Sequence, residues 1–179
     1  MPPNLRRLRY NVAMSLDGFI AGPDGEYDWI AFEPAYDFAA LYRQFDTLLM
    51  GRRTYEVMQQ RGLAPAAMGM KAVVVSTKLA PDAHPGVSII DCGVHEAVAA
   101  LKAQPGKNIW LGGGAMLFRS LLDAGLVDTV EVAVIPVLLG SGVSLLPAGE
   151  RRRLHLEECK ALPGGTLILR YAIQPNSRT

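Results

Sequence analysis

Short apolar runs rich in β-branched residues alternate along the chain with amphipathic segments. The runs predict strands at residues 8–14, 47–50, 72–75, 87–90, 108–111 and 127–134. Between them, the 3.6-residue periodicity predicts helices at 35–45, 52–60, 94–103 and 115–124. This alternation is typical of an α/β fold whose largely parallel central sheet is covered on both faces.

The C-terminal part has a different pattern. Residues 154–162 and 166–173 are two strand-like runs separated only by Pro163-Gly164-Gly165, which predicts an antiparallel hairpin. Residues 21–34 and 61–70 fit no helix or strand and are predicted to be mobile loops over a pocket. We therefore predict a mixed, mostly parallel sheet in a single domain over residues 1–175, with a frayed tail at 176–179.

Composition and charge narrow the possible partners. The chain has 179 residues, 50% of them hydrophobic, which is enough to bury one core. A formal net charge of +1 leaves no broad basic field, so neither nucleic acid nor an anionic membrane is an expected partner. The clusters at Arg6, Arg7 and Arg9 and at 151–153 are interpreted as solvated faces.

Targeting and metal signals are missing from the sequence. The N-terminus has no apolar core of a signal peptide and no segment offers about 18 uninterrupted apolar residues, so we expect a cytoplasmic protein without a membrane span. Cys92 and Cys159 lack a CxxC pattern and are expected to be buried thiols in a reducing compartment. The three scattered histidines predict no metal site.

The most informative chemical feature is a strand that leads directly into three glycines. Residues 108–111 are followed by Gly112, Gly113 and Gly114, and Ala115 begins an apolar helix. Glycines remove every Cβ from this turn, so helix N–H groups can face a pyrophosphate with the helix dipole adding favourable charge. The alternative is that the glycines only allow close packing of strand and helix.

A second junction of this kind lies upstream. Strand residues 47–50 lead into Gly51, and Arg52, Arg53 and Thr54 begin the next helix. A ligand with phosphates explains the presence of two such junctions, one of them basic, better than coincidence does.

A third strand ends in Ser76, Thr77 and Lys78. Two hydroxyls and an ammonium group could hold the ribose 2′-phosphate that distinguishes NADP from NAD. The alternative for Lys78 is an ordinary solvated lysine.

Five motifs occur in a familiar order: AMSLDGFIA at residues 13–21, DWI at 28–30, LMGRRTY at 49–55, WLGGG at 110–114 and VIPVLLGSG at 134–142. With them the chain resembles the dihydrofolate reductase-like superfamily, and more closely the reductase domain of bifunctional riboflavin-biosynthesis deaminase-reductases. The resemblance spans nearly the whole chain. It implies a three-layer α/β/α fold and an NADPH-dependent reductase, usually a homodimer, that transfers a hydride to a C=N or C=O group of a small, pyrimidine- or pteridine-like substrate.

The resemblance also implies roles for individual residues. Gly51 to Thr54 and Gly112 to Ala115 would grip the phosphates, and Ser76 to Lys78 would lie near the adenosine. Asp17 would face the reactive centre, and Trp29 would wall the nicotinamide and substrate pocket. A desolvated Asp17 with a raised pKa could act as an acid, or its carboxylate could bind substrate hydroxyls. Alternatively, Asp17 only shapes the Leu-Asp-Gly turn.

Departures from the family pattern keep other functions open. The predicted first helix offers only Asp37 as a carboxylate, which disfavours folate reduction, and the acidic and aromatic residues 27–32 disfavour a phosphorylated substrate. We find no zinc deaminase motif in these 179 residues and therefore do not expect a complete bifunctional enzyme. A 5-amino-6-(5-phosphoribosylamino)uracil reductase and a non-catalytic NADPH-binding protein remain alternatives, whereas the lack of an N-terminal GxGxxG disfavours a Rossmann protein. The apolar stretch 127–139 is either a dimer surface or core.

Overall fold

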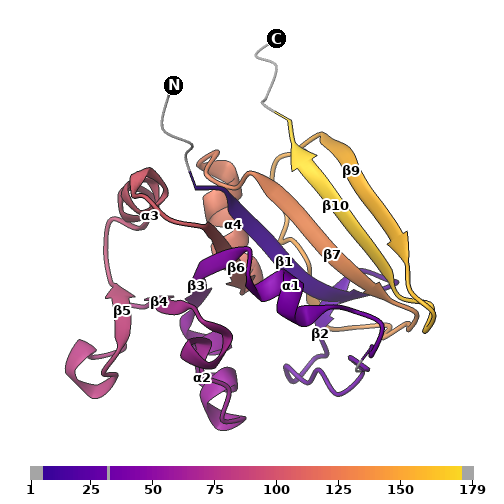
Figure 1. Ribbon diagram of the computed structural model, residues 1–179, viewed down its shortest axis with the longest axis horizontal. Helices are drawn as coiled ribbons and strands as arrows, with labels where there is room; N and C mark the ends of the chain where they lie inside the picture. The colour runs from indigo at the N-terminus through magenta and orange to yellow at the C-terminus, as the bar shows by residue number, and fades with distance from the viewer. Residues whose placement is uncertain (1–5, 32, 175–179) are drawn as a thin grey trace.

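The computed structural model describes residues 6–31 and 33–174, so the predicted tail at 176–179 lies outside the described residues. Eight strands form one sheet at the centre of the molecule (Figure 1). In chain order they are β1 (Leu8–Ser15), β3 (Phe45–Gly51), β4 (Lys71–Val75), β5 (Val87–Ile90), β6 (Asn108–Gly113), β7 (Thr129–Ile135), β9 (Leu154–Ala161) and β10 (Leu167–Ile173).

The spatial order of the strands is β5-β4-β3-β6-β1-β7-β10-β9. All neighbours from β5 to β7 pair in parallel, while β10 pairs antiparallel with both β7 and β9. The sheet is therefore mixed and mostly parallel, as predicted. The predicted hairpin is also confirmed, because Leu162 N donates to the Thr166 carbonyl at 2.9 Å and Gly165 adopts a φ of +85°.

In the described part of the chain, four α-helices cover the two faces of the sheet. They are α1 (Phe38–Tyr42), α2 (Arg52–Gln60), α3 (Val94–Ala103) and α4 (Ala115–Asp123). One core joins α3 and α4 to the face that carries Leu8 and Val132, and a second core joins α1 and α2 to the face that carries Leu48 and Val74. This arrangement gives the three α/β/α layers seen in Figure 1, with α1 in front of the sheet and α4 behind it.

Sequence periodicity accounts for the buried strands and helices. In β4, Ala72 and Val74 face one core while Val73 faces the other, because side chains alternate across a strand that is covered on both sides. In α4, Phe118, Leu121 and Leu122 lie on one buried stripe with helical spacing.

The first helix is shorter than predicted. The periodicity predicts residues 35–45, but α1 covers only Phe38–Tyr42. Asp37 begins the helix by accepting a hydrogen bond from Ala40 N at 2.8 Å, and Phe45 is buried as the first residue of β3. Asp37, the one carboxylate of the predicted helix, thus serves as its N-cap.

Several other features differ from the predictions. The short strands β2 (Phe19–Ala21) and β8 (Val143–Ser144), which form a separate antiparallel pair, were not predicted, nor were the 3₁₀ turns at Pro65–Met68 and Pro81–Ala83. Cys92 and Cys159 are free but exposed rather than buried. Cys159 is exposed because it belongs to β9, the edge strand whose residues almost all contact solvent.

The stretch 127–139 is mainly core. Strand β7 lies between β1 and β10, and six of its seven residues are buried, so this part offers no free dimer face. Leu138, in the loop that follows, is 69% exposed.

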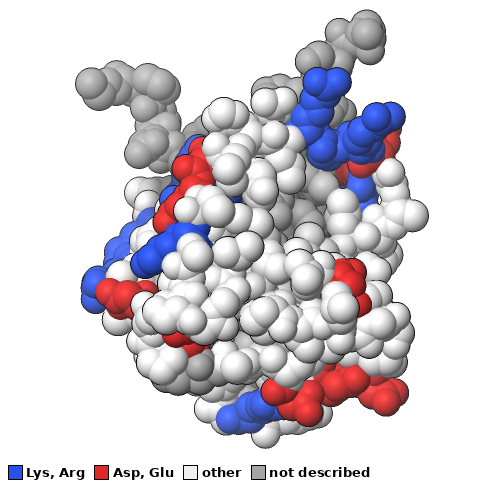
Figure 2. All heavy atoms as spheres, turned by 90° about the vertical axis from the view of Figure 1, so that its right-hand side faces the viewer, with Lys and Arg blue, Asp and Glu red and all other residues white. Residues whose placement is uncertain are grey.

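The surface next to β9 carries its charges in small separate groups. Figure 2, which views the molecule from the right-hand side of Figure 1, shows blue and red patches around a largely uncharged surface. Within the described ranges, none of the helices is long and apolar enough to cross a membrane.

Candidate active site

The two strand-glycine-helix junctions meet at one edge of the sheet. Strands β3 and β6 are parallel neighbours, with Met50 paired to Gly113, so their carboxyl ends lie side by side. A Cβ built on Gly51 would lie 3.6 Å from Gly114 N, and one built on Gly113 would lie 3.3 Å from Thr54 Oγ1. The two glycine turns and Thr54 therefore form one continuous site.

Both helices that begin at this site present free N–H groups. The N-cap residues of α2 and α4 are Gly51 and Gly114, and neither helix has a side-chain hydrogen bond at its cap among the described residues. None of the described side chains therefore accepts a hydrogen bond at these two caps, and the helix dipoles make this edge of the sheet favourable for an anion.

The two arginines at the start of α2 differ in their surroundings. Arg52 is bound to Glu56, one turn along the helix, at 2.6 Å. Arg53 is exposed, and no described residue pairs with it. Arg53 is therefore the cation that is available to a ligand at this junction.

Residues Ser76, Thr77 and Lys78 lie at the same edge, because they follow β4, which pairs with β3 at Gly51. The buried Ser76 Oγ accepts hydrogen bonds from Lys78 N at 3.0 Å and Leu79 N at 3.1 Å, so this hydroxyl shapes its own turn. Thr77 and Lys78 are exposed.

The Asp17 side chain is exposed, and its carboxylate accepts hydrogen bonds from Ser15 and from the backbone of the loop at residues 139–140. Its Oδ1 accepts hydrogen bonds from Ser15 Oγ at 2.6 Å and Leu139 N at 3.1 Å, and its Oδ2 accepts one from Gly140 N at 2.7 Å. The hydrogen bond from Ser15 and those from the 139–140 backbone lower the pKa of Asp17. The alternative of a raised pKa is therefore wrong, and Asp17 is a carboxylate at neutral pH.

Trp29 lies half-buried in the loop between β2 and α1. Its Nε1 donates to the Glu26 carbonyl at 3.3 Å. Ile30 and Ala31 line a cavity over the sheet, whereas Trp29 does not.

This cavity, which we call the sheet cavity, has a volume of about 160 Å³. It is covered by α1 and by Ile30, Ala31, Glu33 and Tyr36, and the hairpin tip closes one end. Glu33 Oε2 accepts a hydrogen bond from Gly164 N at 3.0 Å, which joins the covering loop to the hairpin. The side chains of the floor come from three adjacent strands: Asn11, Ala13, Glu131, Ala133, Ile135 and Ile168.

A second cavity of about 350 Å³ lies on the other face of the sheet, between α4 and residues 145–154. It lies away from the glycine junctions.

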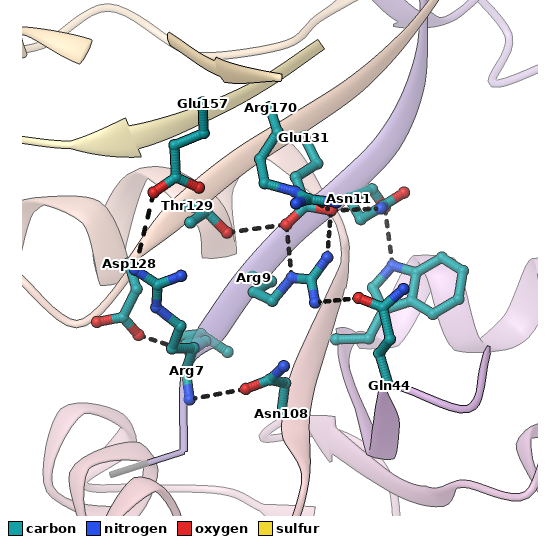
Figure 3. Close-up of polar contacts among 12 residues, drawn as sticks. Arg7, Arg9, Asn11, Gln44, Asn108, Asp128, Thr129, Glu131, Glu157 and Arg170 are labelled. Atoms are coloured by element: carbon teal, nitrogen blue, oxygen red, sulfur yellow. Dashed lines mark hydrogen bonds and ion pairs between the residues drawn. The ribbon is translucent and has the colours of Figure 1, made fainter. Parts of the chain in front are cut away.

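A buried ion pair forms the polar end of the sheet cavity (Figure 3). Arg9 binds both oxygens of Glu131, at 2.5 Å from Nε and 2.6 Å from Nη2, and its Nη1 donates to Gln44 at 2.7 Å. Burial alone would raise the pKa of Glu131, but the hydrogen bonds and charge of Arg9, with Arg170 and Thr129, outweigh it and lower this pKa.

The sequence pattern does not predict this ion pair. Arg9 was interpreted as part of a solvated cluster, but both Arg6 and Arg9 are 5% exposed, and only Arg7 of the three faces solvent. The available signal was a charged residue, Glu131, within the apolar run 127–134, together with Arg9 in another apolar strand. Charges at such positions require a buried partner.

The comparisons with known proteins agree on one family. Residues 6–168 match the model of the RibD C-terminal domain. Protein YyaP of Bacillus subtilis, which is uncharacterized, is 32% identical over 178 residues, covering 93% of this chain and 94% of YyaP. Riboflavin biosynthesis protein RibD of Corynebacterium ammoniagenes is 30% identical over 153 residues, covering 75% of this chain but only 44% of that protein.

Solved structures share the fold. A protein of Shewanella sp. PV-4, provisionally named for riboflavin biosynthesis, superposes with a TM-score of 0.81 at 23% identity, covering 94% of this chain and 99% of that one. A pyrimidine reductase-like protein of Corynebacterium diphtheriae gives a TM-score of 0.67 at 17% identity, with 96% and 93% of the two chains covered. Because the family model spans most of the sequence and this three-layer fold is shared, the chain belongs to the RibD C-terminal domain family.

Proposed function

We propose that this protein is an NADPH-dependent reductase that transfers a hydride to a C=N or C=O carbon of a small molecule bound in the sheet cavity. The observation that carries the proposal is the meeting of two uncapped glycine junctions beside that cavity. Trp110, which lines the cavity, and Gly113 are three residues apart on β6, or about 10 Å of strand. One extended ligand can therefore reach both places.

The residues at the glycine junctions fit a pyrophosphate. Gly51 and Gly114, the residues before α2 and α4, are neighbours, and Thr54 Oγ1 lies beside Gly113 and Gly114. A Cβ on Gly113 would intrude on Thr54, so the absence of side chains keeps this cradle open. Gly51, Gly112, Gly114 and Ala115 complete the backbone of the cradle.

Three residues are proposed to bind the adenosine end. Lys78 and Thr77 are exposed at the end of β4, and Arg53 is the unpaired cation of the neighbouring junction. Two cations at one edge would favour a ribose 2′-phosphate over a hydroxyl, and hence NADPH over NADH. Ser76 supports this turn through its backbone contacts.

The dinucleotide, when bound, supplies the hydride. The apolar walls of the sheet cavity would exclude water from the acceptor carbon. Tyr36 also lines the cavity, and burial, followed by the nearby charge of Glu131, raises the pKa of its hydroxyl. It therefore keeps its proton at neutral pH. Asp17 would order the turn at the rim, and Trp29 would support the covering loop.

A second candidate follows from family membership. A Thermotoga maritima protein described as a deaminase/5-amino-6-(5-phosphoribosylamino)uracil reductase shares the fold, with a TM-score of 0.72 at 14% identity. The present chain covers 57% of that protein. Complementation of a strain that lacks this reductase separates the two functions.

The two ends of β4 provide a matched test of the cofactor. Lys71 is the first residue of β4, and Lys78 lies just beyond the carboxyl end of this strand. Both lysines are exposed. We expect Lys78→Ala to weaken NADPH binding about tenfold while NADH binding stays unchanged, because a charge-assisted contact to the 2′-phosphate is lost. Lys71→Ala is the control and should change neither. Equal losses for both cofactors in Lys78→Ala would remove Lys78 from the 2′-phosphate site.

A further inference from the structure

We propose that Asn11 selects the substrate of this enzyme, and that the substrate is an uncharged planar ring whose N–H group, of the lactam or amide type, donates a hydrogen bond to Asn11 Oδ1. The inference rests on the proposed function, because it places the reducible molecule in the sheet cavity. It adds the chemical class of that molecule and the residue that distinguishes it.

The orientation of the Asn11 amide is fixed by its neighbour. Asn11 Nδ2 donates to Glu131 Oε2 at 3.1 Å, and the reverse orientation would place Oδ1 against a carboxylate. Figure 3 shows this amide beside Glu131, with its oxygen directed away from the carboxylate. None of the described side chains or backbone groups donates to Oδ1. Because Asn11 lines the cavity, this acceptor is available to a ligand.

The two carboxylate oxygens of Glu131 already accept all the hydrogen bonds that they can. Oε1 accepts from Arg9 Nε and from Thr129 Oγ1 at 3.0 Å, while Oε2 accepts from Arg9 Nη2 and Asn11. Arg170 lies 3.6 Å from Oε2. A carboxylate with four donors acts as a rigid support for Asn11 and is not a ligand for the substrate.

The charges at the polar end cancel. Arg9 and Arg170 are balanced by Glu131 and by Glu158, which lies 2.9 Å from Arg170. Neither guanidinium can therefore bind a phosphate or carboxylate without breaking an existing ion pair, which for the buried Arg9 is costly. This arrangement favours an uncharged ligand.

The remaining floor of the cavity is apolar. Ala13 and Ala133 are paired neighbours on β1 and β7, and Ile135 and Ile168 lie beyond them. Two small side chains at the centre leave room for a ring to lie against the sheet. Tyr36 also lines the cavity, and none of the described residues forms a hydrogen bond with its hydroxyl, so this hydroxyl is a second candidate polar contact.

Two matched ligands and one pair of variants test the proposal. The probes are quinolin-2(1H)-one and its N-methyl derivative, which differ in the single N–H, and the planar anion 1-naphthoate. Each is titrated into the protein with and without NADPH. For the wild type we expect the N–H lactam to bind about tenfold more tightly than the N-methyl compound, and 1-naphthoate to bind most weakly.

Asn11→Leu should abolish the difference between the two lactams while NADPH affinity stays unchanged. Asn108→Leu, which alters an asparagine outside the cavity, is the control and should keep the difference. An equal affinity of the wild type for both lactams, or tighter binding of 1-naphthoate, would overturn the inference. Failure of NADPH to bind, with lactam selectivity intact, would instead overturn the cofactor part of the proposed function, so the two failures are distinguishable.

Discussion

At the residue scale, Asp17 and Glu131 are two carboxylates with lowered pKa values and different surroundings. Asp17 is exposed and binds the 139–140 backbone, whereas Glu131 is 4% exposed and binds Arg9. The family resemblance implies that Asp17 is a site residue, and its Leu-Asp-Gly context suggests the alternative of a turn role. It could not predict Glu131, because the partner Arg9 is 122 positions away and only the pairing of β1 with β7 brings the two together.

Replacement of Asp17 by Asn separates its two proposed roles. Asn keeps the shape but loses the negative charge that attracts Leu139 N and Gly140 N, so we expect a lower melting temperature. If Asp17 also orders the rim of the reaction site, turnover falls while NADPH affinity is nearly unchanged. Ser15→Ala removes one hydrogen bond to the same carboxylate and is the matched control. If turnover is unchanged in Asp17→Asn, Asp17 has only a structural role and does not order the reaction site.

The Arg9–Glu131 pair should be sensitive to the loss of one partner. We expect Glu131→Leu to lower the free energy of unfolding in urea by about 3–5 kcal/mol, because it leaves a buried guanidinium without its carboxylate. The double variant Arg9→Met with Glu131→Leu should recover most of that loss. A double variant as unstable as the single one would contradict this explanation.

The same pair makes stability depend on pH. Since the pKa of Glu131 is lower in the folded protein, its contribution is complete above the ordinary value of about 4.3 and is lost as the pH falls through the lowered pKa. The acid-unfolding curve of the double variant should therefore be flatter than that of the wild type below this value.

At the element scale, the two strand-glycine-helix junctions were predictable because each is continuous in sequence. Helices α2 and α3 have the predicted bounds, and most strands differ by one or two residues. Helix α1 was overestimated because Asp37 and Phe45 fix its ends through contacts that periodicity does not contain. Strands β2 and β8 have three and two residues, too few to show any period.

Gly113→Ala tests the cradle at this scale. Gly113 has a φ of +124°, and a Cβ there would lie 3.3 Å from Thr54 Oγ1. Gly125→Ala is the control, because Gly125 also has a positive φ but open space around it. Both variants should lose roughly 1–3 kcal/mol of stability through backbone strain. Only Gly113→Ala should also weaken NADPH binding; equal affinities in the two variants would place the cofactor elsewhere.

At the scale of the whole molecule, the sequence predicted the layers and the mixed sheet but not the order of its strands. Runs that lie far apart in the sequence, such as 47–50 and 108–111, become neighbours in the sheet only through crossovers, which local patterns do not encode. The expected homodimer stays a prediction. The stretch 127–139, which the sequence suggested as a dimer surface, consists mostly of the buried strand β7. A dimer would therefore have to use other surfaces, such as the exposed edge strand β9.

We propose that the glycine edge of the sheet binds NADPH beside the sheet cavity. A calorimetric titration of the purified protein with NADPH, and in parallel with NADH, tests it most directly. We predict one site per chain with micromolar affinity for NADPH and a clear preference over NADH, because Lys78 and Arg53 lie at that edge. Absence of heat with either dinucleotide would contradict the cofactor assignment and, with it, the proposed reductase activity.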